Sequence, residues 1–119
     1  MTFSSESAPY EPLSVETLAQ RLAEADDEVQ LIDVREPAEV ETASLDGFVN
    51  LPLSEFAAWS ETIHSRFERD RETIVLCHHG MRSAQMCAWL AQQGFTQLKN
   101  VTGGIDAYSL TVDRSVPRY

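Results

Sequence analysis

Short apolar runs alternate along the chain with segments in which apolar residues recur every three or four positions. The apolar, β-branched runs are typical of buried strands and lie at residues 29–34, 48–51, 73–76 and 97–101. The segments with helical spacing lie at residues 15–25, 37–42, 55–66, 82–93 and 103–110. This alternation predicts an α/β fold with a mostly parallel sheet.

The run at residues 73–76 is the best candidate for a central strand. It is continuous and rich in β-branched residues, which suits a strand covered on both faces. It ends at Cys77, and a short loop and a further helix follow. Because open parallel sheets bind ligands at the C-terminal ends of their strands, this position predicts a functional site.

The length of the chain, 119 residues, is typical of one domain. Two separate cores would leave too few residues for each. Residues 13–119 are therefore expected to form a single domain, whose first helix is capped by Ser14. Residues 1–12 are expected to form a flexible arm that Pro9 and Pro12 keep extended.

The chain is strongly acidic, with 19 acidic against nine basic residues and a net charge of -10. Such a surface repels phosphate backbones and anionic lipids, so neither nucleic acid nor a membrane is expected as a partner. An anionic substrate would need a local positive site to overcome this field. Arginines near a candidate site are therefore informative.

No apolar run approaches the roughly 18 residues that a transmembrane helix needs. Residues 1–11 also lack the basic start and apolar stretch of a signal peptide, so a cytoplasmic protein is expected. There Cys77 and Cys87 would be thiols, and their spacing of ten residues matches no common zinc or redox pair. Nothing in the sequence demands more than a monomer.

The segment that follows the central run combines three features that favour a thiolate. Successive N–H groups of a tight loop form an anion nest, and a helix that starts near Arg82 presents free N–H groups and the positive end of its dipole. The Arg82 guanidinium adds a formal charge, so each feature favours the anion of Cys77. The same cradle would hold a persulfide sulfur or an oxyanion such as thiosulfate. The expected substrate-binding residues are His78, His79, Gly80, Met81, Arg82 and Ser83.

Simpler interpretations exist for several of these residues. Free cysteines are often buried without chemistry, which is an alternative for Cys77 and the expectation for Cys87, in mid-helix among apolar residues. His78 and His79 are expected to shape the rim of the loop. Adjacent residues rarely converge on one ion, so no metal site is expected. The remaining histidine, His64, lies on a helix, which disfavours a Cys/His hydrolase dyad.

Four segments in order resemble the rhodanese-like family. They are LIDVREP at residues 31–37, GFVNLPL at 47–53, IVLC at 74–77 followed by Arg82 and Ser83, and VTGGIDAY at 101–108. The resemblance spans about residue 13 to the end of the sequence. It implies a three-layer α/β/α fold with a five-stranded, mainly parallel sheet. It also implies an active-site loop at residues 77–82, a persulfide on Cys77 and no cofactor.

Asp33 and Arg35 match the Asp-Val-Arg of the family. The resemblance implies a supporting role for them, as an ion pair or loop support near the site, rather than a contact with substrate. Two positions depart from the family pattern. The histidine of a frequent Gly-His-Ile-Pro-Gly stretch is absent from residues 43–47, and Tyr108 stands where tryptophan is common, so we expect Tyr108 to serve packing.

The resulting hypothesis is a sulfurtransferase that moves sulfane sulfur from thiosulfate or a persulfide donor through Cys77 to a thiol, cyanide or a carrier protein. Its expected partners are a small sulfur-containing anion or a protein persulfide, and a sulfur-acceptor protein. One alternative is a rhodanese-fold binding or regulatory module without turnover. The other is a cysteine-dependent phosphatase of the same fold. The loops of those phosphatases are one residue longer than the four residues between Cys77 and Arg82.

Overall fold

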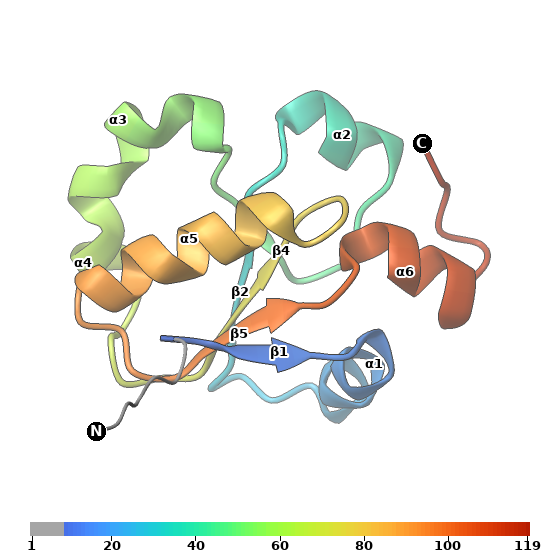
Figure 1. Ribbon diagram of the computed structural model, residues 1–119, viewed down its shortest axis with the longest axis horizontal. Helices are drawn as coiled ribbons and strands as arrows, with labels where there is room; N and C mark the ends of the chain where they lie inside the picture. Colours follow the sequence, from blue (N-terminus) through green and yellow to red (C-terminus); the bar gives the residue numbers. More distant parts are fainter. Residues whose placement is uncertain (1–8) are drawn as a thin grey trace, which may run out of the picture.

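The computed structural model describes residues 9–119, which form a five-stranded sheet with helices on both faces (Figure 1). The strands follow the order β1-β5-β4-β2-β3, and each neighbouring pair is parallel. Their bounds are Glu11–Leu13 (β1), Gln30–Asp33 (β2), Val49–Asn50 (β3), Thr73–Leu76 (β4) and Leu98–Val101 (β5). The expected α/β fold and its five-stranded parallel sheet are confirmed.

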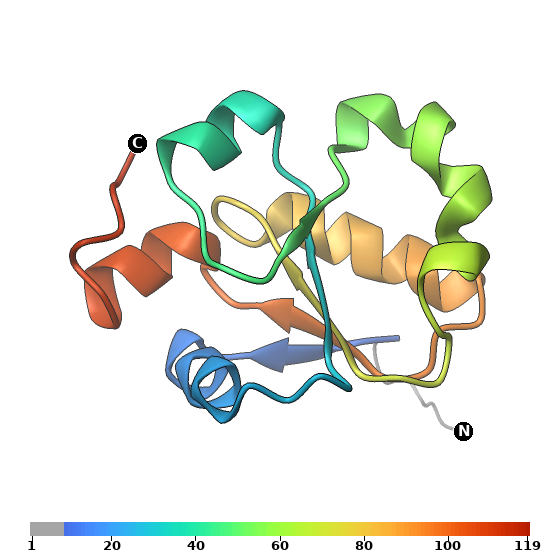
Figure 2. The ribbon, with the colours of Figure 1, turned by 180° about the vertical axis from the view of Figure 1, so that it is seen from behind.

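The helices form one layer on each face of the sheet (Figures 1 and 2). Side chains of α3, α4 and α5 share one core cluster with β2 and β4, and side chains of α1 and α6 share the other. The helix bounds are Val15–Glu24 (α1), Pro37–Thr42 (α2), Phe56–Trp59 (α3), Ile63–Arg66 (α4), Met81–Gln92 (α5) and Gly104–Thr111 (α6). The three-layer arrangement is therefore the one expected.

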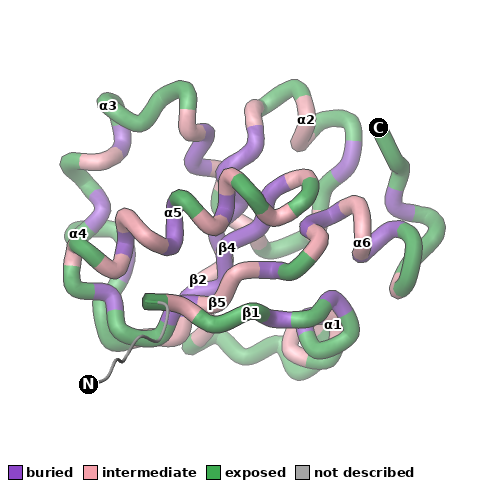
Figure 3. Tube along the Cα trace, viewed as in Figure 1, coloured by how far each residue is buried: buried purple, intermediate pink, exposed green. Residues whose placement is uncertain are grey.

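β4 lies at the centre of both cores. Ile74 and Leu76 belong to the cluster with α1 and α6, whereas Val75 belongs to the cluster with α5, as the alternation of side chains along a strand requires. All three residues have no measurable exposure, and the strand is buried along its length in Figure 3. The continuous apolar run thus reflects burial on both faces.

The prediction of a flexible arm at residues 1–12 is wrong for the last residues of that range. Glu11 and Pro12 belong to β1, which pairs in parallel with β5, and Pro12 lies opposite Asn100. A proline is tolerated here because β1 is an edge strand, where one N–H needs no partner. The first two of the three β1 residues are exposed, so no apolar pattern marks this strand. Residues 1–8 lie outside the described part.

The helix expected at residues 55–66 is also interrupted. Figure 2 shows this green segment turning between α3 and α4, with the 3-10 turn Ser60–Thr62 (η2) between them and Leu53–Glu55 (η1) before α3. The Thr62 hydroxyl donates to the Trp59 carbonyl over 2.8 Å. Hydroxyl groups that bond the nearby backbone compete with helix hydrogen bonds, which accounts for the break.

The remaining helices agree with the sequence within one or two residues. Ser14 caps α1, and its side chain accepts a hydrogen bond from the Thr17 N–H, as expected. Gly94 follows α5 with a φ of +96° in the left-handed region that glycine favours. Between residues 9 and 119, no helix combines the length and apolar character needed to span a bilayer.

Candidate active site

Cys77 lies at the C-terminal edge of the sheet. β4 ends at Leu76, so Cys77 is the first residue of the loop rather than the last residue of the strand, and it is only 1% exposed. The Gly80 N–H donates to its sulfur over 3.0 Å. Gly80 has a φ of +105°, a conformation that glycine adopts at little cost. The tight turn at residues 78–80 therefore directs at least one backbone donor at the sulfur.

Ser83, in the first turn of α5, also contacts the sulfur. Its Oγ lies 3.2 Å from Cys77 Sγ and donates to the side-chain oxygen of Asn100 on β5. The Asn100 amide in turn donates to the Gly80 carbonyl over 3.1 Å. Asn100 therefore joins the loop, α5 and β5 around the sulfur. Asn100 is not predicted from the sequence, because nothing in the short strand Leu-Lys-Asn-Val distinguishes it from Lys99.

The N-terminus of α6 is hydrogen-bonded to the backbone of the loop. The N–H groups of Ile105 and Asp106 donate to the carbonyls of Cys77 and His78 over 2.9 and 3.1 Å. Gly104 has a φ of +63°, and a Cβ there would overlap these same two carbonyls. The second glycine of the Gly-Gly pair is thus required both by its conformation and by the close approach of the loop backbone.

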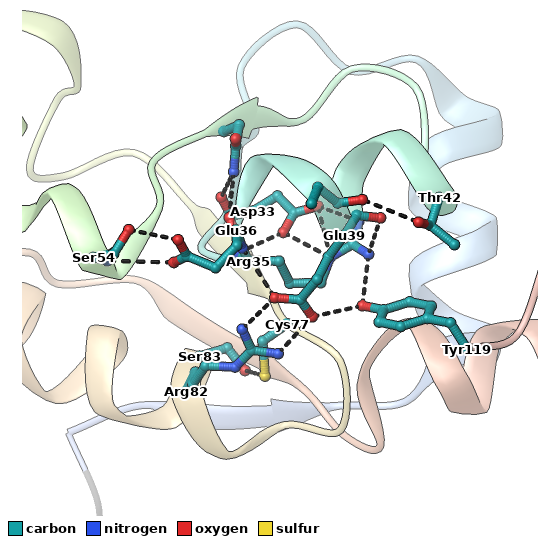
Figure 4. Close-up of polar contacts among 12 residues, drawn as sticks. Asp33, Arg35, Glu36, Glu39, Thr42, Ser54, Cys77, Arg82, Ser83 and Tyr119 are labelled. Carbon is teal, nitrogen blue, oxygen red and sulfur yellow. Dashed lines mark hydrogen bonds and ion pairs between the residues drawn. The ribbon is translucent and has the colours of Figure 1, made fainter.

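Arg82 forms a two-pronged ion pair with Glu39 of α2 (Figure 4). The distances are 2.7 Å from Nη1 to Oε2 and 2.9 Å from Nη2 to Oε1. The hydrogen bonds from Arg82 are the main reason why the pKa of Glu39 falls to about 2, and Glu39 in turn raises the pKa of Arg82. The sequence predicts Arg82 as a positive charge beside Cys77 but contains no local signal for Glu39, which lies 43 positions away.

Asp33 and Arg35 form the ion pair that their motif suggested. Arg35 Nε and Nη2 donate to the Asp33 carboxylate over 3.0 and 2.7 Å, and both side chains are buried. Arg35 also donates to the Ala43 carbonyl over 2.7 Å and to the hydroxyl of Tyr119 over 2.8 Å. With no measurable exposure, Arg35 braces the segment from β2 to α2 and is not placed to contact a substrate.

The chain that places Cys77 among this loop and two helix N-termini has relatives among known proteins. A family model described as Rhodanese-like domain matches residues 14–111. The chain belongs to the rhodanese-like domain family.

Two relatives and one solved structure are similar to this rhodanese-like chain over most of its length. It is 48% identical over 117 residues to the Rhodanese-like/PpiC domain-containing protein 12, chloroplastic, of Arabidopsis thaliana; the match covers 97% of this chain but only 39% of that protein. It is 37% identical over 94 residues to a protein named Sulfurtransferase of Allochromatium vinosum, covering 79% of this chain and 83% of that one. The crystal structure of a rhodanese-related protein of Thermoplasma volcanium matches with a TM-score of 0.69 at 29% identity. The match covers 91% of this chain and 96% of that one. The chain therefore spans well under half of the plant relative.

His78 and His79 lie at the rim of the rhodanese-like loop. The His78 ring stacks between His79 and Tyr119, with centroids 3.9 Å from each. Burial, and then the charge of His79, lowers the pKa of His78. Nitrogens of both histidines and a carboxylate oxygen of Asp106 lie within 4.8 Å of one another. However, the nitrogen lone pairs lie in the ring planes, so those of two stacked rings do not converge on one point. Asp106 also already pairs with Arg118 over 2.9 Å. The cluster therefore fits a metal ion poorly.

Met81 and Cys87, which also contain sulfur, differ from Cys77 in exposure or acidity. Met81 is 75% exposed, so it can serve a bound anion only through its backbone N–H. Cys87 has no measurable exposure, and burial raises the pKa of its thiol to about 12. The expectation of a core thiol at Cys87 is confirmed.

Proposed function

We propose that this protein transfers sulfane sulfur through a persulfide on Cys77. The observation that carries the proposal is the Cys77 sulfur itself, which is held 3.0 Å from the Gly80 N–H and 3.2 Å from the Ser83 hydroxyl at the N-terminus of α5. Donors at these positions stabilise an anionic sulfur. Relatives named sulfurtransferases support the same reaction class.

In the first half-reaction, the Cys77 thiolate attacks the outer sulfur of thiosulfate or of a persulfide. A new S–S bond forms on Cys77 while the S–S bond of the donor breaks, and sulfite or a thiolate leaves with the electron pair. The terminal sulfur of the Cys77 persulfide then faces the first N–H groups of α5, which lack partners within the helix.

In the second half-reaction, a nucleophile attacks this terminal sulfur. The nucleophile is a thiol, cyanide or a sulfur-carrier protein, and Cys77 leaves as a thiolate that is ready for the next donor. No net oxidation or reduction of the protein occurs over the cycle. Each step uses only the polarity of the loop, so the proposal includes no cofactor.

The geometry favours this reaction over phosphate hydrolysis. A phosphate in the loop would need the Arg82 guanidinium, because bidentate arginine contacts are the usual means of holding its oxygens. Arg82 already binds Glu39 through both of its terminal nitrogens. A phosphate would have to displace a carboxylate that is itself well fixed.

Thiocyanate formation from thiosulfate or a small persulfide, with cyanide as acceptor, tests the proposal. The wild type is expected to turn over, and Cys77→Ala is expected to lose the reaction, because it removes the attacking sulfur. The matched control Cys87→Ala removes a thiol that lies in the core. This control should keep the activity per folded molecule. Full activity in Cys77→Ala, or release of phosphate from an aryl phosphate without any sulfur transfer, would contradict the proposal.

A further inference from the structure

The Glu39 carboxylate is held by four donors. Oε1 accepts hydrogen bonds from Arg82 Nη2 and from the Tyr119 hydroxyl, each over 2.9 Å. Oε2 accepts from Arg82 Nη1 over 2.7 Å and from the Glu36 N–H over 3.0 Å. A carboxylate with this many donors is fixed in position and stays ionised. Glu39 is therefore a permanent negative charge at the mouth of the Cys77 loop (Figure 4).

The other guanidinium groups around the loop are paired as well. Arg35 is paired with Asp33, and Arg118 lies 2.9 Å from the Asp106 carboxylate beside His79. The immediate surroundings of Cys77 thus contain paired charges, within a chain whose net charge is -10. Backbone N–H groups can stabilise an anionic donor. Each of these three guanidinium groups, however, already has a carboxylate partner.

We infer that Glu39 determines which class of sulfur donor the site accepts. By occupying Arg82 and adding a fixed negative charge, it disfavours thiosulfate, which carries two negative charges. It favours persulfides, which carry at most one charge on the reacting sulfurs. The inference rests on the proposed sulfur transfer at Cys77. Glu39 is a specificity-determining residue that acts through Arg82 and is not itself a reacting group.

The two donors differ in the charge that the site must accommodate, although the bond changes are alike. With thiosulfate, the Cys77 thiolate takes the outer sulfur and a sulfite dianion leaves with the electron pair. With a persulfide R–S–SH, it takes the terminal sulfur and R–S⁻ leaves, while the proton stays on the transferred sulfur or moves to the leaving thiolate. Repulsion by the Glu39 carboxylate is therefore larger for thiosulfate at both stages. Thiosulfate enters with two charges against at most one for the persulfide, and sulfite leaves with two against one for R–S⁻.

The experiment compares the rates at which Cys77 takes up sulfur from thiosulfate and from 2-hydroxyethyl persulfide, followed by intact mass. In Glu39→Gln, the second-order rate with thiosulfate is expected to rise about tenfold, and that with the persulfide to change by less than about twofold. Glutamine can still close the capping box that Glu39 forms at the start of α2, so the variant should fold. The matched control Glu41→Gln removes the same charge from an exposed position of α2 and should change both rates by less than about twofold.

A second variant tests the Arg82–Glu39 contact while it keeps the Glu39 carboxylate. Tyr119→Phe removes one of the four donors to Glu39, which loosens the Arg82 pair and should raise the thiosulfate rate in the same direction by a smaller factor. Equal effects on both donors, or a thiosulfate rate that falls or stays constant in Glu39→Gln, would overturn the inference and leave sulfur transfer intact. Failure of wild-type Cys77 to take sulfur from either donor would overturn the proposed function and this inference together.

Discussion

At the scale of single residues, the Ser83 hydroxyl links two states of the Cys77 sulfur. It has one proton, which it gives to the Asn100 side-chain oxygen. A Cys77 thiol can then donate to Ser83 Oγ, 3.2 Å away. A thiolate or persulfide anion can only accept, so Ser83 must turn its proton towards the sulfur and join the Gly80 N–H as a donor. Formation of either anion would thus exchange the Ser83–Asn100 hydrogen bond for one to the sulfur.

The Arg82–Glu39 pair should make stability depend on pH. The pKa of Glu39 is about 2 in the folded protein against an ordinary 4.5, mainly because of its hydrogen bonds from Arg82. A lowered pKa gives stability that is complete above the unfolded value and is lost as the pH falls towards the folded one. Because the Arg82 side chain is 35% exposed, solvent screens the pair, and we expect Glu39→Gln to lower the free energy of unfolding by only about 1 kcal/mol at neutral pH.

Urea unfolding at a series of pH values checks this prediction. The difference between the wild type and Glu39→Gln should be constant from neutral pH to about pH 5 and should shrink below the unfolded pKa of 4.5. A difference that stays constant or grows on acidification would show that the ion pair is not its source.

Local sequence identified the residues of this site that lie within one short motif. The loop at residues 77–83 and the Asp33–Arg35 pair are each contained in one short motif. Glu39 and Asn100 could not be found in this way. Glu39 is 43 positions from Arg82, and Asn100 is 17 positions from Ser83. Such contacts depend on how the strands are ordered in the sheet, which local pattern does not encode.

At the scale of elements, two helix N-termini fix the loop from opposite directions. α5 begins directly after Gly80, and its Ser83 hydroxyl lies 3.2 Å from the sulfur. α6 instead donates its N–H groups to the carbonyls of Cys77 and His78. The carbonyls of Cys77 and His78 are therefore directed at α6. A backbone N–H, that of Gly80, rather than a carbonyl therefore contacts the Cys77 sulfur.

Gly104→Ala should separate the loop from α6. The new Cβ would overlap the carbonyls of Cys77 and His78, and a φ of +63° disfavours alanine. We expect sulfur transfer per folded molecule to fall by at least about tenfold, because a small displacement of reacting groups is enough for that loss. The free energy of unfolding should fall by about 1–3 kcal/mol.

Gly47→Ala is the matched control for this variant. Gly47 also has a positive φ, +93°, but its Cβ would meet only Leu31 at an ordinary 3.5 Å. It should therefore lose stability while keeping its activity per folded molecule, measured by thiocyanate formation together with thermal unfolding. Equal activity in the two variants would contradict the assigned role of α6.

The elements that sequence predicted poorly are those with weak amphipathic patterns. β1 has one buried residue, Leu13, and joins the sheet by pairing with β5. The segment from α3 to α4 keeps its apolar side chains in the core, but hydroxyl groups at its centre interrupt the helical hydrogen bonds. Periodicity indicates which side chains are buried and says less about the continuity of the backbone between them.

At the scale of the whole molecule, the strand order explains why distant segments meet. β4 lies between β2 and β5, and parallel strands end at the same edge of the sheet. The segments that follow these three strands are α2 with Glu39, the Cys77 loop, and α6 with Gly104. The alternating pattern of the sequence was sufficient to predict the parallel sheet. The order of its strands, and hence the contacts of the site, required the structure.

The mass of the intact protein after incubation with a sulfur donor, without any acceptor, tests the central claim most directly. We expect a gain of one sulfur atom with 2-hydroxyethyl persulfide, which a thiol reductant removes. The gain should persist in Cys87→Ala and vanish in Cys77→Ala, since only Cys77 lies among the donors of the loop. An unchanged mass with both this persulfide and thiosulfate, or a gain that persists in Cys77→Ala, would contradict it.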